Sequence, residues 1–300
     1  MLNKVIYSCI PTPISQLFAI FARLLNMSGK LFVAFSLIIA LFAGSCNSFS
    51  KIQKSTNLED KFKAAKDYYA KKEYVKAQLL FDELYAVMRN TDKGEDVLYY
   101  LAYSNYNMGD YILAGYQFAV FYRTYPLSTR AEECLYMSAY CHYQISPPYS
   151  LDQYDTYLAI ERFQYFVQMF PNSERVKECN KLIDVLHEKL DKKQFEIAKM
   201  YLNIGEYKAA IASFEQLLHD APATKFREES MFLLIKAKYF LALNSIEAKK
   251  EQRINEAQTQ FNVFVKEFPE SEYMNDANSY QDKINKLRED FQNDKKSKTN

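Results

Sequence analysis

The chain has 300 residues, which suits about two domains or one extended repeat domain. Its 38 basic and 37 acidic residues give a formal net charge of only +1, which argues against a dedicated nucleic-acid-binding protein. Glycine occurs only 6 times, whereas aromatic residues make up 16% of the chain. Phosphate-binding loops and tight hairpins depend on glycine, so the composition disfavours nucleotide-binding and all-β proteins.

Residues 1–45 are predicted to be a signal region. Lys30 is followed by an apolar run at 31–42 and then by Ala43-Gly44-Ser45-Cys46. One basic residue, a short apolar run and small residues before the cut are typical of a secretory signal, and the run is short for a membrane span. Small residues directly before a cysteine resemble the lipobox of bacterial lipoproteins. We therefore expect Cys46 to be the acylated first residue of the mature chain, with 46–57 as a lipidated tether. An ordinary cleaved signal with an incidental cysteine is the alternative.

Translation is expected to start at Met27, which would open a signal peptide of normal length. Pro11 and Pro13 interrupt residues 1–26, and Arg23 splits the remaining apolar stretch, so these residues fit no signal pattern. Residues 47–51, directly after the cysteine, lack the acidic side chains that often mark surface export. This favours the periplasmic face of the membrane.

Five alanines mark a repeat along the rest of the chain: Ala77, Ala114, Ala159, Ala210 and Ala257. A phenylalanine stands four residues after each alanine, Leu or Phe stands seven after, and a proline stands twelve after all but the first. Offsets of 0, 4 and 7 lie on one helix face, and proline ends the helix. With small residues about twelve positions earlier and turns at Gly109 and Gly205, the pattern resembles the tetratricopeptide repeat of about 34 residues.

The predicted fold class is all-α, a right-handed solenoid of about five tetratricopeptide-like helix pairs. Repeats 1–3 are expected over residues 58–175, and repeats 4–5 with a capping helix over 176–292. The capping helix has one apolar stripe, which consists of Ala277, Tyr280, Ile284, Leu287 and Phe291. Residues 293–300 are polar and are predicted to be a disordered tail.

Residues for catalysis or metal binding do not cluster in the sequence. His142, His187 and His219 fall in different repeats, and the acidic residues have ordinary helix-surface spacing. We therefore expect no enzyme activity, no cofactor and no metal. Cys134 and Cys141 are seven residues apart on one predicted helix, too far for a disulfide. The sequence leaves open whether Cys179 pairs with either of them.

Aromatic residues recur on the first helix of each of the first three repeats. Counted from the small residue of each such helix, they stand three positions before it, one position after it and four positions after it. In the first repeat, Lys66 occupies the position directly after the small residue. The predicted peptide-binding residues are Phe62, Tyr69, Tyr99, Tyr103, Tyr106, Tyr136, Tyr140 and Tyr143. Tyrosine offers rigid apolar area with a polar tip, which suits a groove for a peptide. Packing of these rings between helices is the equally weighted alternative.

The third repeat contains the pattern P-x-x-x-D-Q-x-x-T-x-x-A-x-x-x-F from Pro148 to Phe163, and two repeats end in F-P-x-S, at Phe170 and Phe268. Asp152 is expected to cap the second helix of this repeat. Together with the lipobox, these motifs resemble the BamD family of outer-membrane assembly lipoproteins, also called ComL or YfiO.

The resemblance implies a non-catalytic subunit, lipid-anchored on the periplasmic face of the outer membrane, of the machinery that assembles β-barrels. Its C-terminal repeats would dock on the periplasmic POTRA domains of a BamA-like barrel subunit. Its N-terminal repeats would help to recognise the C-terminal signal strand of unfolded outer-membrane proteins. Another periplasmic tetratricopeptide-repeat adaptor, acting in envelope or cell-division organisation, is the alternative.

Overall fold

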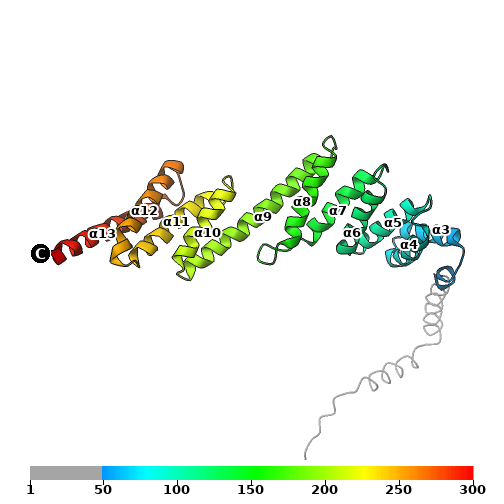
Figure 1. Ribbon diagram of the computed structural model, residues 1–300, viewed down its shortest axis with the longest axis horizontal. Coiled ribbons are helices and arrows are strands. Elements are labelled where there is room, and N and C mark those ends of the chain that lie inside the picture. The colour runs from blue at the N-terminus through cyan, green and yellow to red at the C-terminus, as the bar shows by residue number, and fades with distance from the viewer. Residues whose placement is uncertain (1–48, 300) are drawn as a thin grey trace, which may run out of the picture. The chain divides into compact units, whose positions relative to one another are not determined.

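The computed structural model describes residues 49–299, a range that is mostly helical and contains no strand (Figure 1). The predicted signal region, Met27 and Cys46 lie outside the described residues. After a short helical segment at 49–53 come α3 (Leu58–Ala70), α4 (Tyr74–Met88), α5 (Gly94–Asn107), α6 (Tyr111–Thr124), α7 (Ala131–Ile145), α8 (Tyr154–Met169), α9 (Val176–Asn203), α10 (Tyr207–Asp220), α11 (Arg227–Leu243), α12 (Glu247–Glu267) and α13 (Met274–Thr299).

The chain forms two compact units that divide between Met108 and Gly109. The first unit contains the segment 49–53 and α3 to α5, and the second contains α6 to α13. This division differs from the boundary expected after residue 175. Within the second unit α8 packs on α9, so residues 175 and 176 belong to one compact body.

The repeat alanines are the innermost residues of their helices, as the sequence predicts. Ala77, Ala114, Ala159, Ala210 and Ala257 are all fully buried. The residues seven positions later are also buried, as are the phenylalanines four positions later in the first four repeats. Phe261 is the exception, because it is only partly buried at the edge of the core. Each of these helices therefore buries one stripe against its neighbours, and the predicted all-α fold of helix pairs is confirmed.

Proline ends four of these helices. The residue before Pro126, Pro171, Pro222 or Pro269 is the C-cap in each case, with φ between −125° and −128° and ψ between 59° and 72°. The proline ring disfavours the α conformation for the residue before it, which explains the shared geometry.

The turns inside the helix pairs need a left-handed residue. Gly109 and Gly205 follow the C-caps of α5 and α9 with φ of 82° and 84°. The corresponding residue after α3 is Lys72, which has φ 62°. Glycine adopts this conformation at no steric cost, so the predicted turns are confirmed at the two glycines.

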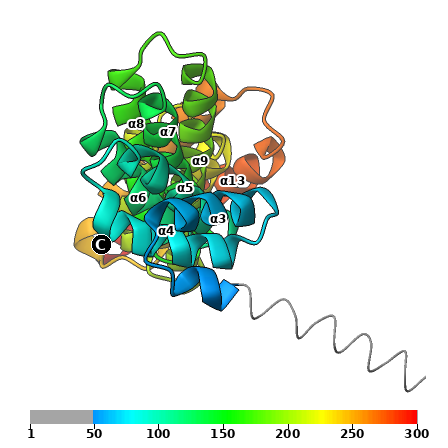
Figure 2. The same ribbon diagram turned by 90° about the vertical axis from the view of Figure 1, so that its right-hand side faces the viewer.

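The segment 49–53 packs on the first unit. The Phe49 ring lies edge-on to Tyr68 at 5.6 Å, and Ile52 contacts the core of α3 and α4. Figure 2 shows the backbone of this segment beside α3 and α4. Lys61 Nζ donates to the backbone carbonyl of Gln53 at 2.8 Å and lies 2.8 Å from Glu83 Oε2. The part of the expected tether that the structure describes is therefore largely fixed to the helices, because its apolar residues cover the open end of their core.

Long helices account for the wide spacing of the later repeats. The 28-residue α9 packs on α8 near its start, and near its end Phe195, Ala198 and Leu202 pack on α10. In α13, where the capping helix is expected, Ala277, Ile284, Leu287 and Phe291 are buried and Tyr280 packs against them.

The end of the chain differs from the sequence prediction. Residues 293–299, expected to be a disordered tail, continue α13 to Thr299. Lys295 supports this last part of the helix, because its Nζ lies 2.8 Å from Glu251 Oε2 on α12 and 5.1 Å from the centre of the Phe291 ring.

Candidate functional site

The eight predicted peptide-binding residues fall into two groups. Phe62 and Tyr69 lie on α3 and the tyrosines 99, 103 and 106 lie on α5, all in the first unit. The tyrosines 136, 140 and 143 lie on α7, in the second unit. Each group is described by itself.

The α5 tyrosines form a row on one side of their helix. They flank Ala102, which is fully buried, and all three are half-buried. The rings of Tyr99 and Tyr103 are 4.8 Å apart, and those of Tyr103 and Tyr106 are 6.3 Å apart. The row is therefore continuous and keeps part of each ring open to solvent.

Tyr100 joins this row to α3, although the sequence analysis did not select it. Its ring lies 5.5 Å from Tyr99, 5.0 Å from Tyr69 and stacks on Phe81 at 5.6 Å. The two adjacent tyrosines in the sequence, Tyr99 and Tyr100, could have indicated it, because adjacent residues of a helix point to different neighbours. We call Phe62, Tyr69, Tyr99, Tyr100, Tyr103 and Tyr106 the first aromatic cluster.

Lysine ammonium groups lie against this cluster. Lys66 Nζ is 5.6 Å from the centre of the Phe62 ring and 5.3 Å from that of Tyr100. Lys93 Nζ is 5.5 Å from Phe62 and forms an ion pair with Glu59. Lys66 forms no ion pair or hydrogen bond with another residue of 49–299. The site therefore offers aromatic surface together with a cation that is available to a carboxylate.

Tyr136 on α7 is a core residue. It is only 4% exposed, and its ring packs 6.0 Å from Phe163 and 5.8 Å from Phe166. Its hydroxyl donates to Glu178 Oε1 at 3.0 Å, and the Arg175 guanidinium lies 4.5 Å from the ring centre. Burial, followed by the Glu178 contact, raises the pKa of Tyr136. The core alternative holds for this residue, because it lies between α7, α8 and α9.

Tyr140 and Tyr143 are partly exposed and stack on each other at 5.7 Å. Tyr140 also stacks on Tyr136 at 5.7 Å, so the buried ring supports the two outer ones. Of the three α7 tyrosines, these two are the ones placed to contact a peptide.

The D-Q-x-x-T motif of the third repeat builds the loop before α8. Gln153 is 3% exposed, and its Nε2 donates to the carbonyls of Pro148 and Leu151 at 2.8 and 3.0 Å. Thr156 Oγ1 donates to Gln153 Oε1 at 2.8 Å. Asp152 Oδ1 accepts from the backbone N–H of Tyr154 at 2.9 Å, although the N-cap position itself is Gln153. The motif therefore shapes the loop and begins the helix.

Lysines of α9 hold the same loop. Lys189 Nζ donates to Ser146 Oγ at 2.7 Å, and Lys193 Nζ donates to the carbonyls of Tyr149 and Leu151 at 3.2 and 2.7 Å. Burial lowers the pKa of Lys189. The loop is thus fixed by both neighbouring helices.

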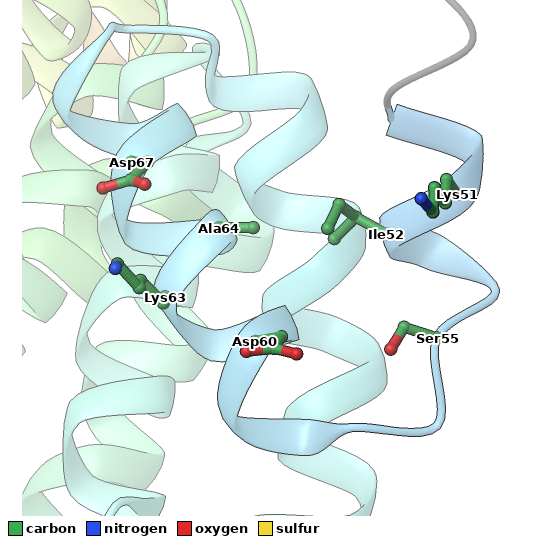
Figure 3. A pocket seen from close by; sticks show the side chains of 7 residues that line it. All are labelled: Lys51, Ile52, Ser55, Asp60, Lys63, Ala64 and Asp67. Carbon is green, nitrogen blue, oxygen red and sulfur yellow. The ribbon is translucent and has the colours of Figure 1, made fainter.

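A surface hollow of the first unit lies between the segment 49–53 and α3, with a volume of about 520 Å³. Its labelled side chains in Figure 3 include Ile52, Asp60, Lys63 and Asp67. Acidic and basic groups alternate around it, so it favours no ligand of one charge.

Among residues 49–299 no group of three or more His, Cys, Asp or Glu side chains is placed to hold a metal ion. Cys134, Cys141 and Cys179 are buried, and none of the three forms a disulfide, which answers the question of their pairing. No helix within the described range is long and apolar enough to cross a membrane.

Residues 54–254 match the model of the YfiO family, described as outer membrane lipoprotein. The chain is 31% identical over 99 residues to the outer membrane protein assembly factor BamD of Caulobacter vibrioides, which covers 33% of this chain and 32% of the relative. It is 29% identical over 99 residues to the BamD of Rickettsia prowazekii, covering 33% of this chain and 39% of the relative. The matched segment thus spans about a third of each relative.

A crystal structure of a TPR repeats protein from Bacteroides fragilis aligns with a TM-score of 0.40 at 12% identity, over 78% of this chain and all of that one. The family match covers more than half of the chain and includes all of α3 to α11. The chain therefore belongs to the YfiO family of outer membrane lipoproteins.

Proposed function

We propose that this chain is a non-catalytic subunit of the machinery that assembles β-barrels in the outer membrane, anchored by acyl chains at Cys46 on the periplasmic face. Membership of a family of outer membrane lipoproteins supports the location. Two relatives of about 30% identity are named outer membrane protein assembly factors, which supports the role. In this role the chain would act as a scaffold with binding surfaces for other proteins, and we propose no reaction for it.

The first aromatic cluster is the proposed site for the C-terminal signal strand of unfolded outer-membrane proteins. Such strands commonly end in an aromatic residue, whose own carboxylate is the end of the chain. Half-buried rings at Tyr99, Tyr100 and Tyr103 offer stacking surface for that residue. Lys66 places an ammonium group against the same rings, where it can pair with the terminal carboxylate. This juxtaposition of Lys66 with the rings is the observation that carries the proposal.

A peptide-binding measurement tests the site. The probe is a fluorescein-labelled peptide with the C-terminal sequence of an outer-membrane β-barrel protein ending in phenylalanine, titrated with the full-length protein in detergent. Tyr103→Ala should weaken binding by about tenfold, which corresponds to about 1.4 kcal/mol. Tyr140→Ala tests the α7 pair in the same way. Tyr157→Ala, which removes a 61% exposed ring on α8, is the control.

The terminal carboxylate has its own control. Replacing it by an amide should weaken binding to the native protein, but not to Lys66→Gln, because the variant lacks the ammonium group. Each variant is first checked for its helical circular dichroism. If Tyr103→Ala unfolds, the ring is part of the core; if it stays folded and binds as before, the site lies elsewhere.

The C-terminal repeats, residues 176–292, are the proposed docking region for the POTRA domains of a BamA-like barrel subunit. The family resemblance carries this assignment, and α9 to α13 form a continuously packed part of the second unit. Exposed side chains on α10 and α12 provide the positions for cross-linking to such a partner.

A further inference from the structure

α6 exposes an unusual number of apolar side chains. Arg123 is its one charged residue, and the side chains that point outward include Ile112, 73% exposed, and Tyr116, 63% exposed. Leu113 is also exposed beside them. Clustered apolar exposure of this kind marks an interaction surface rather than ordinary solvent-facing helix.

A groove of about 470 Å³ runs beside this surface and is lined by residues of α6, α7 and α8. Small residues of α6 and α7 form part of its lining, namely Gly115, Ala119 and Ser138. A Cβ at Gly115 would lie 3.0 Å from the Cβ of Cys141, so glycine allows the two helices to approach closely. Tyr122 and Tyr165, edge-to-face at 6.4 Å, add aromatic surface. The groove is therefore shaped and largely apolar.

The charges that line the groove have one sign. Arg123 of α6 and Arg162 of α8 both line it, and none of the described lining residues is acidic. Neither guanidinium forms an ion pair or hydrogen bond within residues 49–299. His142 also lines the groove, and its Nδ1 lies 3.5 Å from Asp155 Oδ1 without forming a hydrogen bond to it. Two unpaired arginines beside apolar surface complement a carboxylate next to an apolar side chain.

We propose that this groove binds an acidic segment of a partner protein, with an apolar side chain of the segment against Tyr116 and Ala119 and a carboxylate at Arg123 and Arg162. The segment is distinct from the proposed signal strand, because the groove uses no residue of the first aromatic cluster. The second unit thus has a docking surface of its own.

Paired peptides test this proposal directly. One fluorescein-labelled peptide alternates glutamate with phenylalanine and leucine, and the other has glutamine in place of each glutamate. The full-length protein should bind the glutamate peptide at least about tenfold more tightly. The double variant Arg123→Gln with Arg162→Gln should bind both peptides equally, whereas the double variant Lys286→Gln with Arg288→Gln on α13, which also loses two positive charges, should keep the preference. Equal binding of the two peptides by the native protein overturns the proposal.

Cross-linking in cells identifies the occupant. A benzoylphenylalanine in place of Tyr116 should cross-link to a partner segment rich in Asp or Glu, and the arginine double variant should abolish the product. Cross-links only to lipid, only to a second copy of this chain, or to a segment without acidic residues overturn the proposal. The variants Lys66→Gln and Tyr103→Ala should leave this product unchanged, so failure here is distinguishable from failure of the signal-strand site.

Discussion

Lys72 adopts a backbone conformation that two later repeats give to glycine. It has φ 62°, compared with 82° at Gly109 and 84° at Gly205, and in each case a helix has just ended. Backbone hydrogen bonds close the turn, from Lys72 N–H to Tyr69 and from Glu73 N–H to Tyr68. A side chain in this conformation costs about 1 kcal/mol, so the first repeat retains a small strain.

Lys72→Gly should therefore stabilise the first unit by about 1 kcal/mol, because it removes this strain. Urea unfolding followed by circular dichroism measures the change. Lys71→Gly is the matched control, since Lys71 has φ −80° and gains nothing from glycine. Equal effects of the two substitutions would contradict the interpretation.

Burial should make the thiols of Cys141 and Cys179 unreactive. Burial raises the pKa of Cys141 to about 12 and that of Cys179 to about 11. Because of this raised pKa, the thiolate fraction of Cys179 at pH 8 is about 100-fold below that of an ordinary cysteine. The thiolate is the form that reacts with alkylating reagents.

Alkylation by iodoacetamide, with each site quantified by mass spectrometry, should therefore be at least about 100-fold slower at Cys141 and Cys179 than at free cysteine at pH 8. Denaturation in urea should restore the ordinary rate. Rapid modification of either residue in the folded protein would show that the packing around α7 and α9 opens easily.

At the scale of the element, the loop before α8 depends on Gln153. Its amide satisfies two loop carbonyls and accepts from Thr156, all within a buried site. Gln153→Ala should lower the free energy of unfolding by about 1–3 kcal/mol, because buried polar groups lose their partners. Gln216→Ala on α10, whose side chain is exposed, should change it by less than about 0.5 kcal/mol. Similar losses in both variants would contradict the structural role of the motif.

Helix positions were predictable where local chemistry decides them. The four prolines each end a helix at the residue expected, since the restriction acts on the neighbouring residue alone. The buried alanines were predictable because their spacing fixes one helix face. The continuous length of α9 was not predictable, because its sequence does not indicate how many neighbouring helices it contacts.

The candidate site was predicted in part. Spacing placed Tyr99, Tyr103 and Tyr106 on one side of α5, where the structure has them. It placed Tyr136 in the same row, although α8 and α9 cover that ring. Spacing within one helix cannot report which neighbours lie over it, and for the same reason it missed Tyr100.

At the scale of the whole molecule, the proposed anchor lies close in sequence to the first unit. Three residue steps separate Cys46 from Phe49, which packs against Tyr68. An extended chain of that length spans at most about 10 Å. With Cys46 acylated, as proposed, the first unit would therefore be held near the membrane surface.

Cys46→Ser should release the protein from membranes into the soluble fraction, because no acyl chains would hold it. Fractionation of cells that express the native protein or the variant, followed by immunoblotting, measures the distribution. A variant that stays with the outer membrane after a high-salt wash would contradict attachment by this cysteine.

Affinity purification of the full-length protein from membranes tests the proposal that this chain works within the outer-membrane β-barrel assembly machinery. Membranes are dissolved in a gentle detergent after brief cross-linking, and the recovered partners are identified by mass spectrometry. We predict a large barrel protein with POTRA domains, cross-linked to residues within 176–292. Recovery of envelope or cell-division proteins without such a barrel subunit would contradict a role in β-barrel assembly and favour a different periplasmic repeat adaptor.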